Sequence, residues 1–291
     1  MNKAVQEFRE ELTGKIIQAI QDGTAPWQRP WNGREAHQNA LTKRQYTGIN
    51  QLALSIKGME FDEGKDPRWL TFKQASDNGW KIKKGSKGTH VTLWKPFVDE
   101  KNEISAVWEK VFTVFHASQI DGIGEYVPPE INEIESHEKA EEIIRNSNAD
   151  IQYGGGSAFY RPSEDFIQMP PKDDFKSMEN YYSTLLHELT HWTGHSSRLN
   201  RNQNGGKYSK DYAFEELIAE MGSMFVVSSA GIIQTDGEFQ NHASYVDSWL
   251  KNLKRDSNYI FKAAAEANKA ANFLLKNEEE NINEVDACAT A

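Results

Sequence analysis

Apolar residues recur at helical spacing in the first 22 residues of the chain. They follow one another at intervals of three or four residues: Val5, Phe8, Leu12, Ile16 and Ile20. This spacing puts them on one face of a helix, and the dipeptide Asp-Gly that follows is typical of a helix end. The pattern therefore predicts an opening amphipathic helix over residues 4–22, followed by a second, short helix over residues 49–56.

The pattern changes to alternation between residues 69 and 115. The segment WLTFKQASDNGW predicts a short helix, and THVTLWKPFV and AVWEKVFTVFH then alternate apolar and polar residues on either side of the sequence DEKNE. Alternation predicts half-buried strands, and the short polar connection predicts that they form a hairpin. We therefore expect this part of the chain to be small and α+β.

A break follows at residues 126–137, where YVPPEINEIESHE combines two prolines with acidic residues. The sequence beyond it predicts a helix to about residue 146, short strands at 151–153, 158–160 and 166–169, and helices over 177–193, 211–229, 239–254 and 256–276. We predict two domains, residues 1–127 and 128–291. The expected fold class is α+β, with a small α+β domain followed by a mostly helical domain that contains a small sheet.

The composition fits a folded two-domain protein without membrane contact. The chain has 291 residues, of which 38% are hydrophobic and 26% charged, and it has no run of 18 apolar residues, which a membrane helix would need. The N-terminal helix lacks the apolar block of a signal peptide, so we expect a cytoplasmic location. The one cysteine is Cys288, so a metal site would use histidine and carboxylate ligands.

Charge divides the chain unevenly. Residues 1–128 contain 18 Lys and Arg against 16 Asp and Glu, a net charge of +2, and the remaining residues contain 15 against 27, a net charge of −12. Six of the eight tryptophans also lie in the first part. The overall charge of −10 would disfavour nucleic acid as a partner if it were evenly spread, but this division leaves the first part able to bind an anionic partner.

The sequence STLLHELTHWTGH carries candidate metal chemistry. His187 and His191 are four residues apart on a predicted helix, so both imidazoles lie on one face and can bind one zinc ion at about 2.0–2.1 Å. Glu188 is placed to take a proton from a water on that ion, as in zinc peptidases. The alternative is a partly buried helix whose histidines only hydrogen-bond to neighbours. His195 is two residues short of the position of a third histidine ligand after this motif, and we assign it to the turn or to the surroundings of the site.

The next predicted helix, YAFEELIAEMGSMFV, offers a third ligand. It carries Glu215, Glu216 and Glu220 among apolar residues, and buried carboxylates need partners. Glu216 and Glu220 share a helix face, so one can bind the metal while the other anchors a ligand histidine from behind. We prefer Glu220 as the ligand and keep Glu216 as the second choice. Zinc is the expected ion, although such ligands also accept manganese or another divalent ion.

Other parts of the second domain suggest how a substrate would be held. The predicted hairpin SAFYRPSEDFIQMP can supply an edge strand that aligns a peptide by backbone hydrogen bonds. The candidate donors for stabilising a transition state are Tyr160, Tyr208, His242 and Tyr245. The sequence does not choose among them.

A basic and aromatic stretch lies in the first domain. No acidic residue occurs from Asn78 to Val98, whereas the stretch contains Lys81, Lys83, Lys84, Lys87 and Lys95 together with Trp80, Trp94 and Phe97. Lysines that follow a phosphate backbone, set between rings on which bases stack, are typical of a single-strand binding surface, where each stacked base contributes about 1–3 kcal/mol. The alternative is a lysine-rich hairpin on an ordinary surface with tryptophans in its core. Further residues extend the same patch if their loops fold onto it: Arg29, Arg34, Lys43, Arg44 and Tyr46.

Nine blocks in order resemble a known family. They are TAPWQRPW, YTGIN, WLTFKQA, GWKIKKGSKGTHVTLWK, VFHASQIDG, AFYRPSEDFIQMP, HELTHWTGH, YAFEELIAEMGS and SYVDSWLKNLKRD. Together they cover about residues 5–276 and resemble the antirestriction proteins of the ArdC type. The resemblance implies an N-terminal domain that binds single-stranded DNA and a C-terminal zincin-like metallopeptidase domain, in proteins of plasmids and conjugative elements that protect incoming DNA from host restriction. The peptidase half is also similar in layout to the Spartan-type proteases that digest proteins crosslinked to DNA.

The resemblance also implies roles for individual residues. It makes His187 and His191 metal ligands, makes Glu188 the base, and puts the acidic ligand in EELIAE, which leaves Glu216 and Glu220 open. It implies DNA contacts near Trp27, Trp31, Tyr46, Trp69, Trp80, Lys83, Lys84 and Lys87.

Three functional hypotheses follow. The first is an antirestriction protein that binds the entering single strand and carries a zinc metallopeptidase domain. It would cleave a restriction enzyme or another DNA-bound protein, or it would act by occupancy alone. The second is a single-stranded DNA-binding protein whose zinc-braced domain is catalytically silent. The third is a plain zinc peptidase whose lysines are incidental.

Overall fold

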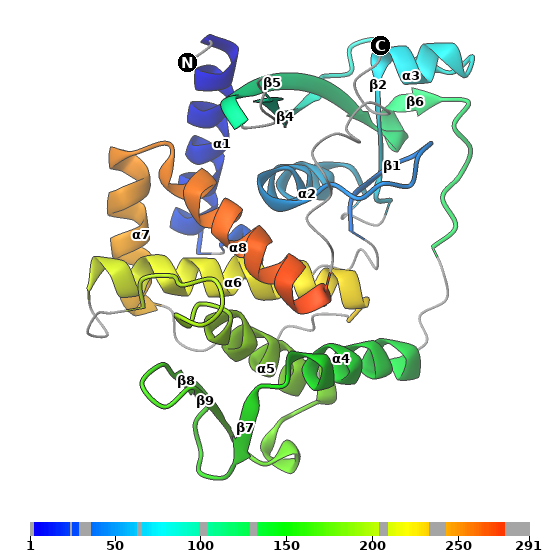
Figure 1. Ribbon diagram of the computed structural model, residues 1–291. Coiled ribbons are helices and arrows are strands. Elements are labelled where there is room, and N and C mark those ends of the chain that lie inside the picture. Colours follow the sequence, from blue (N-terminus) through cyan, green and yellow to red (C-terminus); the bar gives the residue numbers. More distant parts are fainter. Residues whose placement is uncertain are drawn as a thin grey trace. The chain divides into compact units, whose positions relative to one another are not determined.

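The computed structural model describes residues 3–23, 25–28, 36–62, 66–98, 104–128, 133–203, 209–232 and 243–276 (Figure 1). The chain divides into two compact units. Among the described residues, unit 1 contains residues 3–12 and 36–128, and unit 2 contains residues 13–28 and 133–276. The first helix, α1 (Lys3–Gln21), therefore contributes residues to both units.

Unit 1 contains a four-stranded sheet with the strand order β1-β2-β5-β4. Beyond the first turns of α1, its elements are β1 (Gln38–Asn39), α2 (Gly48–Asp62), β2 (Arg68–Thr71), α3 (Phe72–Asp77), β3 (Lys81–Ile82), β4 (Thr89–Val98), β5 (Ile104–His116), η2 (Ala117–Gln119) and β6 (Ile120–Asp121). β1 and β2 run parallel, whereas β2 with β5 and β5 with β4 are antiparallel. β4 and β5 form the long hairpin that alternation predicts.

Two small cores can be identified among the described residues of unit 1. In the first, Leu54 of α2 packs against Trp69, Val91 and Val114 of the sheet, and all four side chains are buried. The second lies around α3, where Leu70, Ala75 and Ile120 are buried and Trp80 packs against them. Burying large apolar side chains is the main favourable contribution to folding, so these cores fix α2 and α3 against the sheet.

Unit 2 is mostly helical and has a three-stranded sheet with the order β7-β9-β8. Its elements beyond α1 are η1 (Pro26–Gln28), α4 (Glu133–Ser147), β7 (Asp150–Tyr153), β8 (Phe159–Arg161), β9 (Phe166–Met169), η3 (Lys172–Asp174), α5 (Met178–Trp192), α6 (Lys210–Ala230), α7 (Ala243–Arg255) and α8 (Tyr259–Leu275). α6 is buried over most of its length and contacts α5, α7 and α8 (Figure 1). β8 and β9 both contact α5, so the sheet and the helices form one unit.

The expected α+β fold class with two domains is confirmed. The opening helix, the long hairpin, the three short strands and the helices α5, α6 and α8 lie within a few residues of their predicted positions. Residues 239–242 of the predicted helix 239–254 lie outside the described residues, and α7 begins at Ala243. Within the part of the chain that the structure describes, no helix has both the length and the apolar character needed to cross a membrane.

The segment WLTFKQASDNGW corrects one prediction, because its first residues form strand β2 and the helix begins only at Phe72. Thr71 ends the strand and caps the helix. Its hydroxyl accepts a hydrogen bond from the Gln74 N–H at 3.2 Å, and the Gln74 side chain accepts one from the Thr71 N–H at 3.0 Å. This reciprocal capping box satisfies two N–H groups at the helix start.

Candidate metal centre

Helix α5 presents the two histidines of the HELTH motif on one side. Ser177 caps its N-terminus by accepting a hydrogen bond from the Asn180 N–H at 3.3 Å. The apolar face of the helix is buried, which fixes its rotation about its own axis. His187 and His191 therefore lie one turn apart, with 4.8 Å between their ring centroids.

Helix α6 approaches α5 closely because of a glycine. A Cβ atom on Gly222 would lie 2.5 Å from Cγ2 of Thr190, which is closer than carbon atoms can pack. The missing side chain lets the two helices come together, and it thereby brings the acidic side chains of α6 to the histidines of α5.

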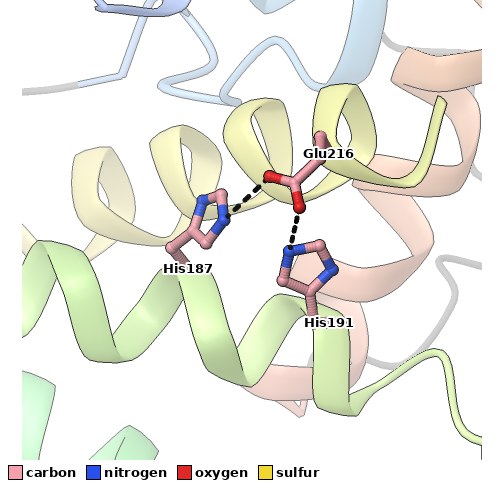
Figure 2. Close-up of side chains that lie close together, drawn as sticks. All are labelled: His187, His191 and Glu216. Atoms are coloured by element: carbon pink, nitrogen blue, oxygen red, sulfur yellow. Dashed lines mark ion pairs between the residues drawn. The ribbon is translucent and has the colours of Figure 1, made fainter. Parts of the chain in front are cut away.

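Glu216 of α6 lies between the two imidazoles (Figure 2). Its Oε2 is 3.7 Å from Nε2 of His187, and its Oε1 is 3.7 Å from Nε2 of His191. Ligands about 2.0–2.1 Å from a tetrahedral zinc ion are about 3.3 Å apart, so these spacings are close to those of a metal site. Nitrogen and carboxylate ligands suit zinc and also manganese, and the three residues therefore fit a divalent metal.

The other two glutamates of α6 lie behind the histidines. Oε1 of Glu215 is 3.2 Å from Nδ1 of His191, and Oε1 of Glu220 is 3.9 Å from Nδ1 of His187. Each histidine thus faces Glu216 with one ring nitrogen and another carboxylate with the other. Carboxylates in this second position orient ligand histidines and fix which nitrogen carries the proton. Glu216 thus faces both rings and Glu220 lies behind one of them, which is the reverse of the arrangement that we preferred from the sequence.

The buried charges of this centre perturb one another. Burial lowers the pKa of His187, but its hydrogen bond with Glu216 and the charge of Glu220 outweigh this effect and raise that pKa to about 9. Burial alone would raise the pKa of Glu216, but the two histidines outweigh this effect and lower that pKa to about 2. Four carboxylates are buried here: Glu188, Glu215, Glu216 and Glu220. Such a concentration of negative charge away from water favours a bound cation.

Glu188 lies beside the candidate metal ligands and contacts the sheet. Burial raises the pKa of its carboxyl, although both histidines and a hydrogen bond from the backbone N–H of Tyr160 in β8 act in the opposite direction. A carboxylate with a raised pKa accepts a proton more readily near neutral pH, as a general base must.

Three other residues at the centre do not appear among those that the sequence suggested. Tyr212, one turn before Glu216 on α6, hydrogen-bonds to Glu216 and to Tyr245. The spacing of four residues could have indicated this contact. Arg201 and Gln203 contact Glu215 from the loop after α5. Nothing in the local pattern indicated that this loop returns to the helix.

The structure separates the candidate donors for a transition state. The hydroxyl of Tyr160 donates a hydrogen bond to Asp165 at 2.8 Å, so it is committed to the hairpin. Tyr245 is buried, and its ring lies 5.6 Å from that of Tyr212. Tyr208 and His242 lie outside the described residues.

The structure also separates the residues expected at DNA. Trp27 and Trp69 are both 0% exposed, so these rings belong to the core and present no face to a base. Tyr46 and Trp80 are partly buried, and Trp31 lies outside the described residues. The exposed lysines are Lys81, Lys83, Lys84 and Lys87. Phe72 is 64% exposed at the start of α3, and the sequence pattern gave no reason to select it.

Two family models match the chain. Residues 6–145 match the N-terminal domain of anti-restriction factor ArdC. Residues 138–266 match a zincin-like metallopeptidase.

Three relatives match over nearly the whole chain. Two proteins of Escherichia coli named DNA primase TraC are 39% and 38% identical over 98% and 95% of this chain, which spans only 28% and 20% of their lengths. The uncharacterized protein y4eC of Sinorhizobium fredii is 31% identical, and the match covers 92% of this chain and 91% of that protein.

Two solved structures are also similar. They are crystal structures of the antirestriction ArdC protein from the R388 plasmid in its Mn(II)-bound and metal-free forms, 37% and 38% identical to this chain. Both have a TM-score of 0.77. The matches cover 94% and 92% of this chain and 98% and 97% of theirs.

Proposed function

This chain belongs to the ArdC family of antirestriction proteins, and we propose that it binds single-stranded DNA through unit 1 and hydrolyses a DNA-associated protein at a metal centre in unit 2. Protection of incoming DNA from host restriction would be the result. The observation that carries the proposal is the convergence of His187, His191 and Glu216 beside Glu188.

His187, His191 and Glu216 would hold the metal. Zinc is the proposed ion because the domain is zincin-like, and manganese is the alternative because a related structure contains Mn(II). When bound, such an ion supplies Lewis acidity toward a peptide carbonyl and toward water. Glu220 would keep its position behind His187.

Glu188 would act as the general base. Its carboxylate would accept a proton from the attacking water and hold it until the leaving amine takes it, which requires a pKa nearer to neutral than that of an exposed glutamate. Burial has this effect on the pKa of Glu188. The backbone N–H of Tyr160 would orient the Glu188 carboxylate for this proton transfer.

Strand β8 would align the substrate. It lies at an edge of the three-stranded sheet, and its residue Tyr160 contacts Glu188 directly through the backbone. A peptide that pairs with an edge strand is held by main-chain hydrogen bonds, which makes binding tolerant of sequence. This arrangement suits a protease whose substrates have DNA binding, and not sequence, in common.

Single-stranded DNA would bind on the surface of unit 1 around α3 and β3. The exposed lysines of residues 81–87 would contact phosphates, and Phe72 would stack on a base. Asn39 donates a hydrogen bond to Gln74 at 3.1 Å, which ties the turn before Lys43 and Arg44 to α3, and these two cations would extend the same surface.

Glu188→Gln tests the catalytic half of the proposal. The variant keeps the shape of the side chain but not its basicity, so we expect it to retain metal and DNA binding and to lose about 10²- to 10⁴-fold in kcat for cleavage of a protein bound to single-stranded DNA. Cleavage by the variant at the wild-type rate would refute the role of Glu188.

A second candidate function is single-strand binding with a structural metal. It is favoured by the position of the three ligands, since an ion there would crosslink α5 to α6 whether or not it is catalytic. Transfer of unmodified DNA into a restricting host distinguishes the two functions. If the Glu188→Gln variant protects as well as the wild type, proteolysis is not the mechanism.

A further inference from the structure

The loop after α5 folds back on the end of that helix. Residues 193–203 follow the HELTH motif, and their backbone makes turns within the loop, with the N–H of Leu199 donating to the Thr193 carbonyl at 3.0 Å and the N–H of Arg201 donating to the Gly194 carbonyl at 2.9 Å. These hydrogen bonds bring Arg201 and Gln203 next to the residues where the helix ends. The loop is therefore an ordered part of the metal centre's surroundings and not a simple connection.

Arg201 belongs to this loop, and its side chain is buried, with only 4% of it exposed. Its guanidinium donates to both carboxylate oxygens of Glu215, from Nε to Oε2 at 3.0 Å and from Nη2 to Oε1 at 2.7 Å. It also donates to the Thr190 carbonyl at 2.7 Å and to the Thr193 hydroxyl at 2.8 Å. A two-point contact of this kind fixes the plane of a carboxylate as well as its position.

Glu215 and Gln203 both contact His191. Oε1 of Glu215 is 3.2 Å from Nδ1 of the ring, and Nε2 of Gln203 donates to the His191 carbonyl at 2.6 Å and to Oε1 of Glu215 at 3.1 Å. The ring and the backbone of one histidine are thus held by a single network of hydrogen bonds.

We propose that Arg201, acting through Glu215, is a positioning residue that sets the orientation and the proton position of His191 for metal binding. The inference rests on the proposed metal centre. A fixed acceptor at Nδ1 keeps the ring proton on that nitrogen and leaves Nε2, which faces Glu216, as the free donor for a metal. Gln203 supports the same acceptor from the other side.

Gly194 supports this role for the loop. A Cβ atom at this position would lie 2.6 Å from Nε2 of Gln203 and 2.8 Å from Nη2 of Arg201. Any side chain here would displace the two donors that hold Glu215. The absence of a side chain at Gly194 therefore leaves room for the two donors that hold Glu215.

The test compares two arginines of the same loop in the full chain. Arg201→Gln removes the contact to Glu215. Arg198→Gln is the matched control, because Arg198 is also an arginine paired with a carboxylate, but it pairs with Asp165 and stacks on Trp192 at 3.7 Å. After removal of metal by a chelator, each protein is titrated with MnCl2 and with ZnCl2 by calorimetry. We expect Arg201→Gln to weaken metal binding about 10- to 100-fold and Arg198→Gln to leave it unchanged.

A spectroscopic measurement separates positioning from a general loss of structure. In the zinc-loaded, 15N-labelled wild type, the Nδ1 protons of His187 and His191 should both give slowly exchanging imidazole signals. In Arg201→Gln only the His191 signal should be lost, and the His187 signal serves as the internal control. If Arg201→Gln fails to fold, Gln203→Met and Arg201→Lys replace it, and each should weaken metal binding because each removes part of the contact to Glu215.

The outcomes distinguish the inference from the function on which it rests. If the wild type binds neither metal, the proposed metal centre is wrong. If the wild type binds metal and the substitutions at Arg201 and Gln203 change neither the affinity nor the His191 signal, the centre stands and the positioning role is refuted. Equal losses in Arg201→Gln and Arg198→Gln would also refute it, because the effect would then belong to the loop as a whole.

Discussion

Glu215, Glu216 and Glu220 share one helix but lie on different sides of the two histidines. Glu216 faces both Nε2 atoms, whereas Glu215 and Glu220 each lie behind one ring. An imidazole has two nitrogens that point in different directions from the ring, so a pair of histidines can be held by three carboxylates in this way. The residue that bridges the two rings is the one whose loss should matter most for metal binding.

We therefore expect Glu216→Gln to remove most of the metal and Glu220→Gln to weaken it less. Loss of a ligand takes away a charge and a bond, whereas loss of an orienting carboxylate costs about 10- to 100-fold in affinity. Elemental analysis of the purified variants, with His187→Ala as the metal-free reference, measures the metal per chain. The opposite order, with the metal lost in Glu220→Gln and kept in Glu216→Gln, would restore Glu220 as the ligand.

His37 should make the stability of the protein sensitive to acid. Burial, and next the charge of His116, lower its pKa from 6.5 to about 3, and its Nδ1 accepts a hydrogen bond from Nε1 of Trp69 at 3.0 Å, which a protonated Nδ1 could not do. Between these two pKa values, the unfolded chain binds a proton at His37 that the folded chain does not bind. The contribution of neutral His37 to the free energy of unfolding should therefore be fully present above pH 6.5. It should fall between pH 6.5 and about 3 by up to about 1.4 kcal/mol per pH unit.

Urea unfolding at several pH values checks this expectation. His37→Gln should flatten the dependence in that window, and His195→Gln, which changes a partly buried histidine of the loop after α5, is the comparison variant. An unchanged slope in His37→Gln would show that other groups cause the acid sensitivity.

Sequence reasoning identified the kinds of residue at the centre better than their roles. His187, Glu188 and His191 follow from spacing along one helix, and the carboxylates follow from their apolar neighbours. The choice between Glu216 and Glu220 depends on the rotation of α6 relative to α5, which the period of a single helix does not contain. The burial of Trp27 and Trp69 could not be predicted either, because an aromatic residue beside basic residues can lie on a surface or in a core.

At the scale of elements, the distance between α5 and α6 decides whether the metal ligands converge. Gly222 and Thr190 are in contact where these helices cross, and the space for a side chain is absent there. Long elements with clear periods were predictable, as the hairpin of β4 and β5 illustrates. The short strands β1, β3 and β6 have two residues each, too few to alternate, and β2 runs directly into α3.

Gly222→Ala should therefore destabilise the protein and weaken metal binding together. Inserting a methyl group into a close-packed contact costs about 1–3 kcal/mol, and the helices would have to separate to accept it. Gly14→Ala is the matched control, because Gly14 is also in a helix but has open space where a Cβ would be. Gly14→Ala should instead increase the free energy of unfolding by about 0.5–1 kcal/mol.

Thermal unfolding with and without ZnCl2 measures both effects. If Gly222→Ala melts like the wild type and binds metal equally well, the close approach of α5 and α6 is not required for the site.

At the scale of the whole molecule, the two parts of the chain differ in charge. Residues 1–128 have a net charge of +2 and the rest −12. The carboxylates of the second part include those that surround the candidate metal site, and Lys81, Lys83, Lys84 and Lys87 of the first part are exposed. The division was visible in the sequence because charge counts do not depend on the fold, whereas the exposure of Phe72 was not.

Binding of a labelled single-stranded oligonucleotide should weaken steeply with salt. The logarithm of the affinity should fall with the logarithm of the salt concentration with a slope of about −0.7 for each phosphate contacted. Lys84→Gln combined with Lys87→Gln should make the slope shallower, whereas Lys262→Gln, at an exposed lysine on α8, should not. Fluorescence anisotropy at several salt concentrations provides the slopes, and equal slopes for all variants would argue against this surface.

The main-chain N–H of Tyr160, and not its side chain, donates the hydrogen bond to Glu188, so the residue at position 160 can change without loss of this contact. An amide N–H is the same in nineteen of the twenty amino acids, so drift at this position can change the phenol ring and its partner Asp165 without removing the donor. Proline alone lacks it. Homologues that keep the base should therefore tolerate many residues at this place in the strand but exclude proline.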